Sequence, residues 1–338
     1  MAAPEEMDAR EETSAEERLI AKYFRPLATH PGALGLGDDA AVLTPPQGRD
    51  LVLTTDGVIS GVHFFPDDPP ETIGRKALRM NLSDLAAKGA TPIGFLMSVA
   101  LPANIEENWL GAFASGLGED ARRYSCPLLG GDTDRTPGPI SVSIAAFGSV
   151  PSGKMVRRAT AKSGDCVMVT GAIGDAALGV LLRGDQHLAE RLRLSEMACA
   201  HLRERYLLPQ PRNALAEAVL HHASAAMDVS DGLAGDFAKL CRASCVAGEV
   251  DVGRIPLSDA ARAVLAADPA LLETVLTGGD DYEIVLTLAP RKLSAFQTAA
   301  RAADVTVTEI GRVTAGEGTR FIRDGRPLKL TRPSYSHF

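Results

Sequence analysis

The chain has 338 residues, 45% of them apolar, and a formal net charge of -8. A chain of this length can bury a substantial hydrophobic core and is long enough for two domains. Nucleic acid is not an expected partner, because an acidic chain lacks the basic face that binds phosphate backbones non-specifically.

The first residues predict a protein that stays inside the cell. Residues 1–18 carry seven acidic side chains and two arginines, without the basic start and apolar core of a secretory signal. We expect residues 1–15 to form a disordered acidic leader. No window approaches the roughly 18 consecutive apolar residues of a membrane span. The five cysteines are odd in number and scattered, as in a reducing compartment, so the sequence predicts a cytoplasmic protein without a membrane partner.

Apolar periodicity predicts alternating strands and helices in the first half of the chain. Ser14 and Glu17 have the spacing of a capping box, and the ordered fold is expected to begin there. The predicted strands cover residues 50–59, 93–100 and 140–147, and the predicted helices cover 71–88 and 106–124. This alternation indicates an α/β or α+β class, with residues 16–150 as the N-terminal domain.

The stretch 150–162 is the expected domain boundary, because it contains proline and glycine, is basic and has little periodicity. Beyond it, a strand at 166–170 leads through a glycine turn into a helix. Further strands are expected at 225–229 and 282–288, with a helix at 231–243. Residues 151–338 are therefore the predicted C-terminal domain.

Two phosphate-binding patterns are present only in outline. Gly35–Ala40 fits a dinucleotide-binding pattern, but no strand precedes it and two carboxylates lie where a pyrophosphate would bind. Gly148–Lys154 has the glycine and lysine spacing of a phosphate loop, but Met155 replaces the Ser or Thr that would bind magnesium. Both are better explained as turns.

Aspartates recur beside Gly, Ser or Thr at the predicted ends of apolar segments. The five loops are GDDAAVL with Asp38 and Asp39, TTDGV with Asp56, GGDTD with Asp132 and Asp134, DVSDGL with Asp228 and Asp231, and GGDDYE with Asp280 and Asp281. Any single loop is explained as well by a turn or a helix cap, which Asp and Gly favour. Five together indicate a metal site, because clustered carboxylates repel unless a cation lies between them, and oxygen ligands suit magnesium.

Asp84 is an independent indication of a metal. It falls on the apolar stripe of the helix predicted at 71–88, opposite Arg75 and Arg79. A carboxylate in that position is costly unless it is paired or bound to metal. A buried salt bridge or a cap to a neighbouring loop is the alternative, and we favour metal ligation.

Three other polar residues are candidates for ligand contacts. Ser230 precedes a helix whose N-terminus can either cap itself or face an anion. Arg158 can offer a forked donor to phosphate, or be a solvated surface residue. His63 follows the TTDGV strand, where a core or turn histidine is as good an explanation as a substrate contact.

The segments GDDAAVL, TTDGVISGVHFF, NLSDLAAKGATP, GGDTD, DVSDGL and GGDDYE, in this order, resemble the thiamine-monophosphate kinase family. The likeness runs from about Leu19 to Phe338, and the histidine after TTDGV and the ending SYSHF resemble this kinase within its superfamily of ATP-dependent synthetases. Each motif alone is weak, whereas the ordered set is highly specific.

The resemblance implies a two-domain fold like that of aminoimidazole ribonucleotide synthetase, with a homodimer formed through the sheet of the first domain. It implies magnesium-dependent transfer of the γ-phosphate of ATP to thiamine monophosphate, the last step of thiamine diphosphate biosynthesis.

The implied metal ligands are Asp39, Thr54, Thr55, Asp56, Asp84, Asp132, Asp228 and Asp231. Of these, the implied catalytic set is Asp56, Asp84, Asp132 and Asp228. The implied nucleotide contacts are Gly131, Asp132, Arg158 and Ser230, and the implied substrate contacts are His63 and Asp280.

Two positions depart from the family pattern. Asp280 stands where the family usually has a glutamate, so its side chain is one methylene shorter. Arg332 lies where the family has an aromatic residue near the C-terminus, and Tyr335 follows it.

A phosphate acceptor shapes the expected mechanism. A phosphate monoester has a second pKa of about 6, so it is largely dianionic at neutral pH and needs no general base. Direct in-line transfer between two anions held by magnesium therefore suits a site rich in Asp, without a Ser–His or Cys–His nucleophile. The alternatives are a related ATP-dependent enzyme with another acceptor, such as a hydrogenase-maturation or aminoimidazole ribonucleotide synthetase type, and a non-catalytic nucleotide- or metal-binding regulator.

Overall fold

The computed structural model of the chain describes residues 14–331 and 334. The predicted acidic leader at 1–15 lies outside this range except for Ser14 and Ala15, and so do Arg332 and Tyr335. Ser14 is the N-cap of α1 (Ala15–Leu19). Its hydroxyl accepts from the Glu17 amide at 3.0 Å, and the Glu17 carboxylate accepts from the Ser14 amide at 2.6 Å, which confirms the predicted capping box.

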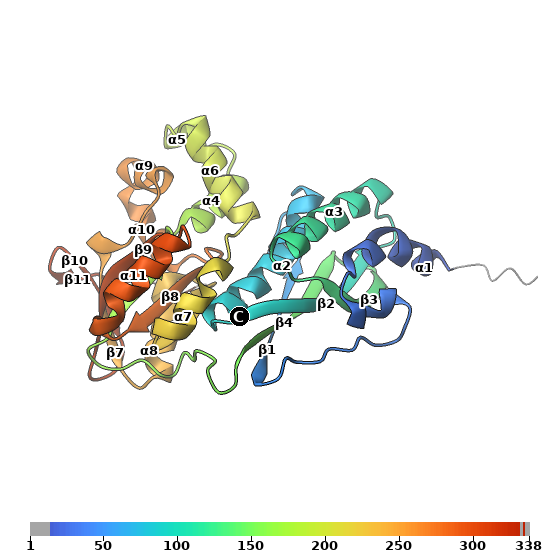
Figure 1. Cartoon of the computed structure of the whole chain (residues 1–338). Coiled ribbons are helices and arrows are strands. Elements are labelled where there is room, and N and C mark those ends of the chain that lie inside the picture. Colours follow the sequence, from blue (N-terminus) through green and yellow to red (C-terminus); the bar gives the residue numbers. More distant parts are fainter. Residues whose placement is uncertain (1–13, 332–333, 335–338) are drawn as a thin grey trace, which may run out of the picture.

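The chain folds around two separate β-sheets, which lie side by side in Figure 1. The first sheet has the order β1–β4–β2–β3, and all its pairs are antiparallel except β2 with β3. Its strands are β1 (Arg49–Ile59), β2 (Thr91–Pro102), β3 (Leu128–Thr136) and β4 (Ser141–Pro151). The helices α2 (Pro70–Ala87) and α3 (Glu107–Arg123) accompany them. The strand at GGDTD was expected to be a loop; pairing with β2 along its whole length makes it strand β3 instead.

The second sheet has the order β11–β10–β7–β9–β5–β8–β6. Its strands are β5 (Cys166–Thr170), β6 (Ala225–Val229), β7 (Ala247–Asp251), β8 (Glu283–Leu288), β9 (Val307–Thr314), β10 (Thr319–Arg323) and β11 (Arg326–Pro327). The associated helices are α4 (Asp175–Gly184), α5 (Leu188–Arg191), α6 (Glu196–Leu207), α7 (Ala216–His222), α8 (Leu233–Ala243), α9 (Asp259–Ala267), α10 (Leu272–Thr277) and α11 (Leu293–Ala302). The strands β5, β6 and β8 are buried along their whole length. This holds even for β6, the edge strand, because α2 and α8 pack against it.

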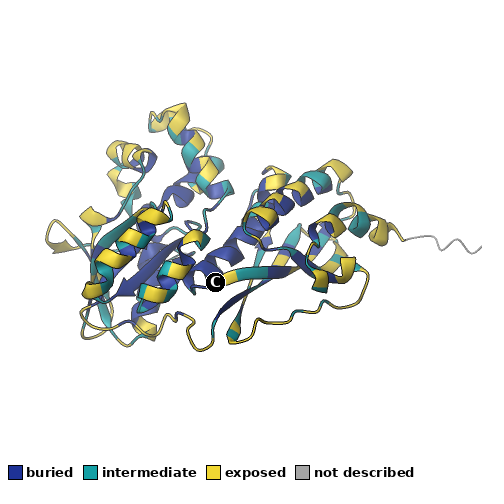
Figure 2. Cartoon of the chain, in the orientation of Figure 1, coloured by how far each residue is buried: buried dark blue, intermediate teal, exposed yellow. Residues whose placement is uncertain are grey.

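Helix α2 joins the two halves and is buried nearly all round (Figure 2). Arg79, expected on a face opposite the apolar stripe, has no exposed surface, because α3 places the equally buried Asp120 beside it. The Arg79 guanidinium also donates to the carbonyl of Pro209 at 2.8 Å. At the C-terminal end of α2, Lys88 donates through Nζ to the carbonyl of Ala226 on β6 at 3.0 Å. This end of the helix therefore docks on the second sheet.

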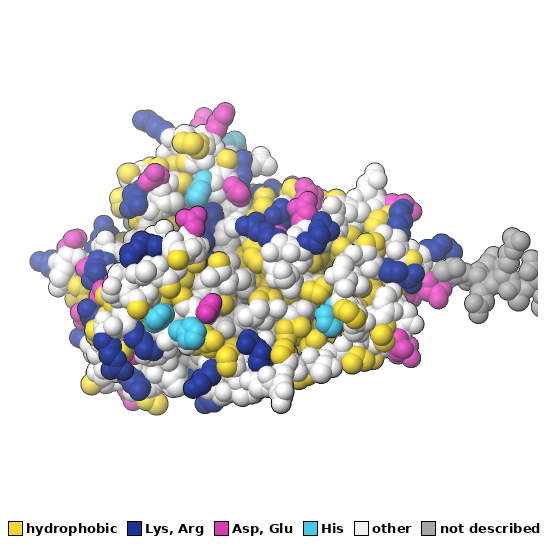
Figure 3. All heavy atoms as spheres, viewed as in Figure 1, with side chains coloured by type: hydrophobic (Ala, Val, Ile, Leu, Met, Phe, Trp, Pro, Cys, Tyr) yellow, Lys and Arg dark blue, Asp and Glu magenta, His cyan; other side chains and the backbone are white. Residues whose placement is uncertain are grey.

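Within the described part of the chain, no helix is both long and apolar enough to cross a membrane. On the face seen in Figure 3, Lys and Arg side chains occur in several separate groups among hydrophobic and uncharged atoms.

Candidate active site

Strand β1 and helix α2 bring three of the predicted metal ligands together. The burial pattern of β1 alternates, so Thr54 and Asp56 share one side of the strand. The Thr54 hydroxyl donates to the Asp84 carboxylate on α2, and the Asp56 amide donates to Oδ1 of Asn81, one helical turn earlier, at 3.1 Å. Thr55 points to the opposite side, where its hydroxyl donates to the carbonyl of Ile144 at 3.0 Å.

The C-terminal end of β6 adds two further carboxylates, Asp228 and Asp231. Burial, with the charges of Asp84 and Asp231, raises the pKa of Asp56 to about 7. Burial, with the carboxylates of Asp84, Asp236 and Asp56, raises the pKa of Asp228 well above its usual range. Four predicted ligands from three distant segments of the sequence are therefore close enough to repel one another.

Three residues at this cluster were not singled out from the sequence. Lys88 approaches Asp228 and Asp84 from the end of α2, and burial lowers the pKa of its ammonium. Lys239 forms ion pairs with Asp231 and with the fully buried Asp236, the latter at 2.8 Å. Asp236 and Lys239 are three residues apart on α8, a spacing that places ion-pair partners on one helix face, but nothing in the sequence indicates that Asp231 lies against them.

The donor set fits magnesium by type, since carboxylate and hydroxyl oxygens are the ligands that this hard cation prefers. Across residues 14–331 and 334, however, no three His, Cys, Asp or Glu side chains are placed so that they could hold a metal ion as they stand. Protein donors occupy two of the four carboxylates: Thr54 donates to Asp84, and Lys239 donates to Asp231. The cluster supplies the right atoms, and metal binding requires these side chains to exchange partners.

A second group of predicted residues lies apart from this cluster. Asp39, Gly131 and Asp132 line a cavity of about 820 Å³ between the N-terminal helical segment and the first sheet. Gly131 is required there, because a Cβ atom at that position would lie 1.8 Å from the carbonyl oxygen of Met97 on the neighbouring strand.

The strand register sets the separation of the two groups. Asp56 on β1 is level with Ile144 on β4, which is level with Met97 on β2 and then with Gly131 on β3. Three inter-strand steps put Asp132 and Asp56 on the order of 14 Å apart. Within one chain, these two carboxylates cannot bind the same magnesium ion.

The residues expected to contact the acceptor come from opposite halves of the chain. His63 lies in the turn after β1, where its Nδ1 accepts from the Ile59 amide at 3.1 Å. Asp280 lies in the loop before β8 with a φ of 73°, a conformation that non-glycine residues rarely adopt. Tyr282, in the same loop, is buried, and its pKa is raised well above the usual range by burial and by the carboxylates of Asp280, Asp56 and Asp228. The Asp280 loop therefore borders the carboxylate cluster.

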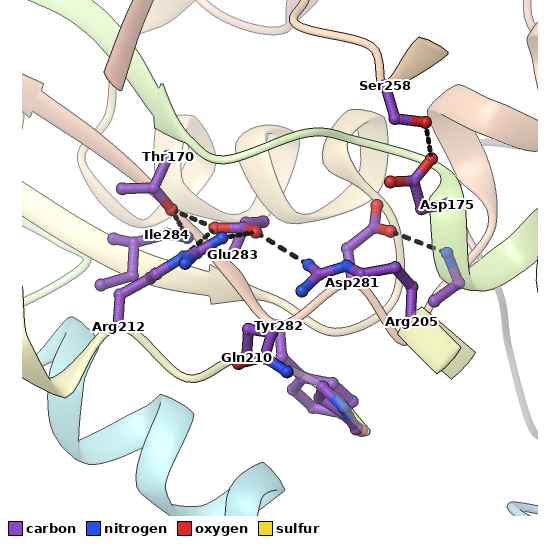
Figure 4. A network of polar contacts seen from close by, with 12 residues as sticks. Thr170, Asp175, Arg205, Gln210, Arg212, Ser258, Asp281, Tyr282, Glu283 and Ile284 are labelled. Atoms are coloured by element: carbon purple, nitrogen blue, oxygen red, sulfur yellow. Dashed lines mark hydrogen bonds and ion pairs between the residues drawn. The ribbon is translucent and has the colours of Figure 1, made fainter. Parts of the chain in front are cut away.

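Buried charges on both sides hold this loop (Figure 4). Asp281, grouped from the sequence with the other Asp loops, caps α4: it accepts from the amides of Gly174 at 2.7 Å and Ala176 at 3.3 Å. Glu283 has no exposed surface and accepts from the side chains of Thr170, Arg205 and Arg212. Glu283 is the last residue of the GGDDYE motif, but the sequence alone assigns it no role, because its burial and its arginine partners depend on the tertiary structure.

The two predicted phosphate contacts flank the cluster. Arg158 is exposed in the segment between the sheets and lies within electrostatic reach of Lys88. Ser230 follows β6 directly, and its carbonyl accepts from the Asp280 amide at 2.9 Å.

Known proteins resemble this chain along most of its length. Residues 37–150 match the family described as AIR synthase related protein, N-terminal domain, and residues 162–324 match the corresponding C-terminal domain. The thiamine-monophosphate kinase of Caulobacter vibrioides is 42% identical over 322 residues, which cover 94% of this chain and 89% of that protein.

Solved structures of thiamine-monophosphate kinases are also similar to this chain. The crystal structure of thiamine-monophosphate kinase from Stenotrophomonas maltophilia K279a has a TM-score of 0.81 at 38% identity, covering 92% of this chain and 96% of that one. AaThiL complexed with AMPPCP and TMP has a TM-score of 0.75 at 31% identity, covering 89% and 91%. These matches confirm the resemblance seen in the sequence and the two-domain α/β fold that it implied. The chain belongs to the thiamine-monophosphate kinase family.

Proposed function

We propose that this protein transfers the γ-phosphate of ATP to thiamine monophosphate, giving thiamine diphosphate and ADP. The observation that carries the proposal is the group of mutually repelling carboxylates, Asp56, Asp84, Asp228 and Asp231, beside the Asp280 loop. The complex of the related AaThiL with AMPPCP and TMP supports both the nucleotide and the acceptor.

The carboxylates would hold magnesium rather than act as bases. Because the acceptor phosphate has a second pKa of about 6, its attacking oxygen is already deprotonated at neutral pH. The remaining obstacle is repulsion between the acceptor and the triphosphate, which bound magnesium relieves by neutralising their charges. We assign this role to Asp56, Asp84, Asp132 and Asp228, with Asp39, Thr54 and Asp231 as further ligands. The Thr55 hydroxyl faces the other side of β1 and is not included in this set. Transfer is then direct and in line.

The remaining predicted contacts divide between the two substrates. Gly131, Asp132, Arg158 and Ser230 would bind the nucleotide. His63 and Asp280 would bind the acceptor.

Single-turnover phosphorylation tests this function. Purified protein mixed with thiamine monophosphate, ATP and magnesium is expected to form thiamine diphosphate and ADP in equal amounts, and EDTA is expected to stop the reaction because the carboxylates then lose their cation. Thiamine and aminoimidazole precursors serve as control acceptors. ATP binding without thiamine diphosphate formation would transfer the assignment to a related synthetase or to a regulator.

We also propose a cytoplasmic homodimer formed through the first sheet. The face of this sheet away from α2 leaves Leu53 63% and Ile59 37% exposed on β1 and Leu96 36% exposed on β2, which is unusual for one face of a sheet unless another surface covers it. Asp132 is in register with Ser98, whose exposed side chain lies on this face. For the dimer to complete the site, Asp39 and Asp132 of one protomer would have to reach the Asp56 cluster of the other past β1, the edge strand of the sheet.

Leu53→Glu is expected to convert the dimer to a monomer, because it would place a charge in an apolar interface. Sedimentation velocity should report the mass of one chain instead of two, and kcat should fall at the same time. Met197→Glu is the matched control: Met197 is 82% exposed on α6, in the other half of the chain, and this variant should remain dimeric and active. A wild-type protein that sediments as a monomer would contradict the proposal.

A further inference from the structure

One buried ammonium group contacts both residues expected to bind the acceptor. Lys76 lies on α2, and its side chain is only 3% exposed. Its Nζ donates to the backbone carbonyl of His63 at 3.0 Å and pairs with Oδ2 of Asp280 at 2.8 Å. His63 belongs to the N-terminal domain and Asp280 to the C-terminal domain, so this contact fixes one relative to the other.

An aromatic ring completes the surroundings of Lys76. The ring centroid of Tyr206, on α6, lies 4.1 Å from Nζ, which is the geometry of a cation–π contact. The Tyr206 hydroxyl donates at 2.9 Å to Asp68, a buried carboxylate in the same segment as His63. Arg183 of α4 donates to the other oxygen of Asp68 at 3.0 Å. The C-terminal domain therefore also holds the His63 segment from a second side.

These contacts leave one oxygen of Asp280 for another partner. Lys76 binds Oδ2, whereas Oδ1 has, among residues 14–331 and 334, only a long contact of 3.4 Å from the Tyr282 hydroxyl. The Asp280 side chain is 25% exposed, so a ligand can reach it. The backbone around it is fixed by the caps and ion pairs of Asp281 and Glu283. Because the backbone of the loop is held in place, the direction of the Asp280 carboxylate depends on the contacts of its side chain. The bond from Lys76 to Oδ2 sets this direction.

We propose that Lys76 is a positioning residue for the acceptor: it sets the distance between His63 and the Asp280 carboxylate, and thereby the affinity for thiamine monophosphate. This inference rests on the proposed function and adds a residue to it. Lys76 acts through its two neighbours and need not touch the substrate. If Lys76 formed only a structural ion pair, its loss would destabilise the fold but would not change the KM for thiamine monophosphate more than the KM for ATP. The test therefore compares these two KM values.

Lys76→Met keeps most of the side-chain volume and removes the ammonium group. We expect the KM for thiamine monophosphate, and its Kd by calorimetry in the absence of ATP, to rise at least tenfold, while the KM for ATP stays within twofold. Asn213→Ala is the matched control, because it removes another contact between the two halves, from Asn213 to the Leu82 carbonyl at 3.1 Å, which involves neither His63 nor Asp280. That variant should leave the KM for thiamine monophosphate unchanged.

A second comparison stays informative if Lys76→Met is poorly folded. Lys76→Met combined with Asp280→Asn leaves no unpaired charge at this position. If Lys76 acts through Asp280, adding Lys76→Met to Asp280→Asn should raise the KM for thiamine monophosphate less than threefold. The inference would be overturned if Lys76→Met raised the KM for thiamine monophosphate by the same factor in the wild-type and in the Asp280→Asn background. It would also be overturned if Lys76→Met raised the KM values for ATP and for thiamine monophosphate in parallel. Failure of the wild-type protein to phosphorylate thiamine monophosphate would instead refute the proposed function, and the two failures are thus distinguishable.

Discussion

Asp56→Asn is expected to lower kcat by roughly 10³-fold, equivalent to about 4 kcal/mol of transition-state stabilisation. The substitution keeps the size of the side chain and removes one charge from a cluster that has to hold magnesium between two anionic substrates. The fold should survive, since the hydrogen bond from Asp56 to Oδ1 of Asn81 is donated by the Asp56 backbone amide, which the substitution leaves unchanged. Without magnesium, the melting temperature should equal or exceed that of the wild type, because asparagine removes a partly desolvated charge that repels Asp84 and Asp231.

The measurement is single-turnover kinetics at saturating magnesium, together with thermal unfolding in EDTA. Asp324→Asn serves as the charge-matched control, since Asp324 is 95% exposed and far along the chain, in the turn after β10. It should retain normal kcat. Near-normal turnover by Asp56→Asn would rule out the role proposed for Asp56.

Glu283→Leu is expected to lower the free energy of unfolding by about 3–5 kcal/mol, the usual cost of breaking a buried ion pair from one side. Glu283 lies at the centre of the network in Figure 4, where it accepts from Arg212 Nε at 2.6 Å, Arg205 at 2.9 Å and Thr170 at 2.6 Å. Leucine would leave both guanidinium groups without their shared acceptor. Denaturant unfolding measures the loss, and kcat/KM should also fall, because the neighbouring Asp280 loop loses one of its anchors.

The control for this prediction is Glu249→Gln in the same sheet. Glu249 is 46% exposed and forms one ion pair, with Arg320 at 3.4 Å. Exposed pairs of this kind contribute only about 0–1 kcal/mol. If Glu283→Leu were as mild as Glu249→Gln, the network would not hold the loop.

The sequence determined much of this fold, because most of its signals are local. Strand β1 and helix α2 end within a residue or two of their predicted limits, and the capping box at Ser14 is present. Hydrophobic alternation and helical periodicity depend on neighbouring residues alone, so they can be read without the tertiary structure. The strands β7, β9, β10 and β11 were not predicted, since their ladders depend on partners distant in the chain.

The family was also determined by the sequence, because an ordered set of motifs needs no coordinates. The structure then brought Asp56, Asp84, Asp228 and Asp231 together from separate motifs. Their roles as ligands remain a proposal, as do the domain limits at 16–150 and 151–338.

Only the tertiary structure decided how buried charges are paired and how far apart the motifs lie. Arg79 belongs to the core because α3 supplies Asp120, and Asp132 is separated from Asp56 because β1 and β3 are opposite edges of one sheet. Lys76 joins His63 to Asp280, which lies 204 positions after Lys76 in the chain. A sequence pattern records which residues are charged, whereas the energy of a buried charge depends on the partners that packing places around it.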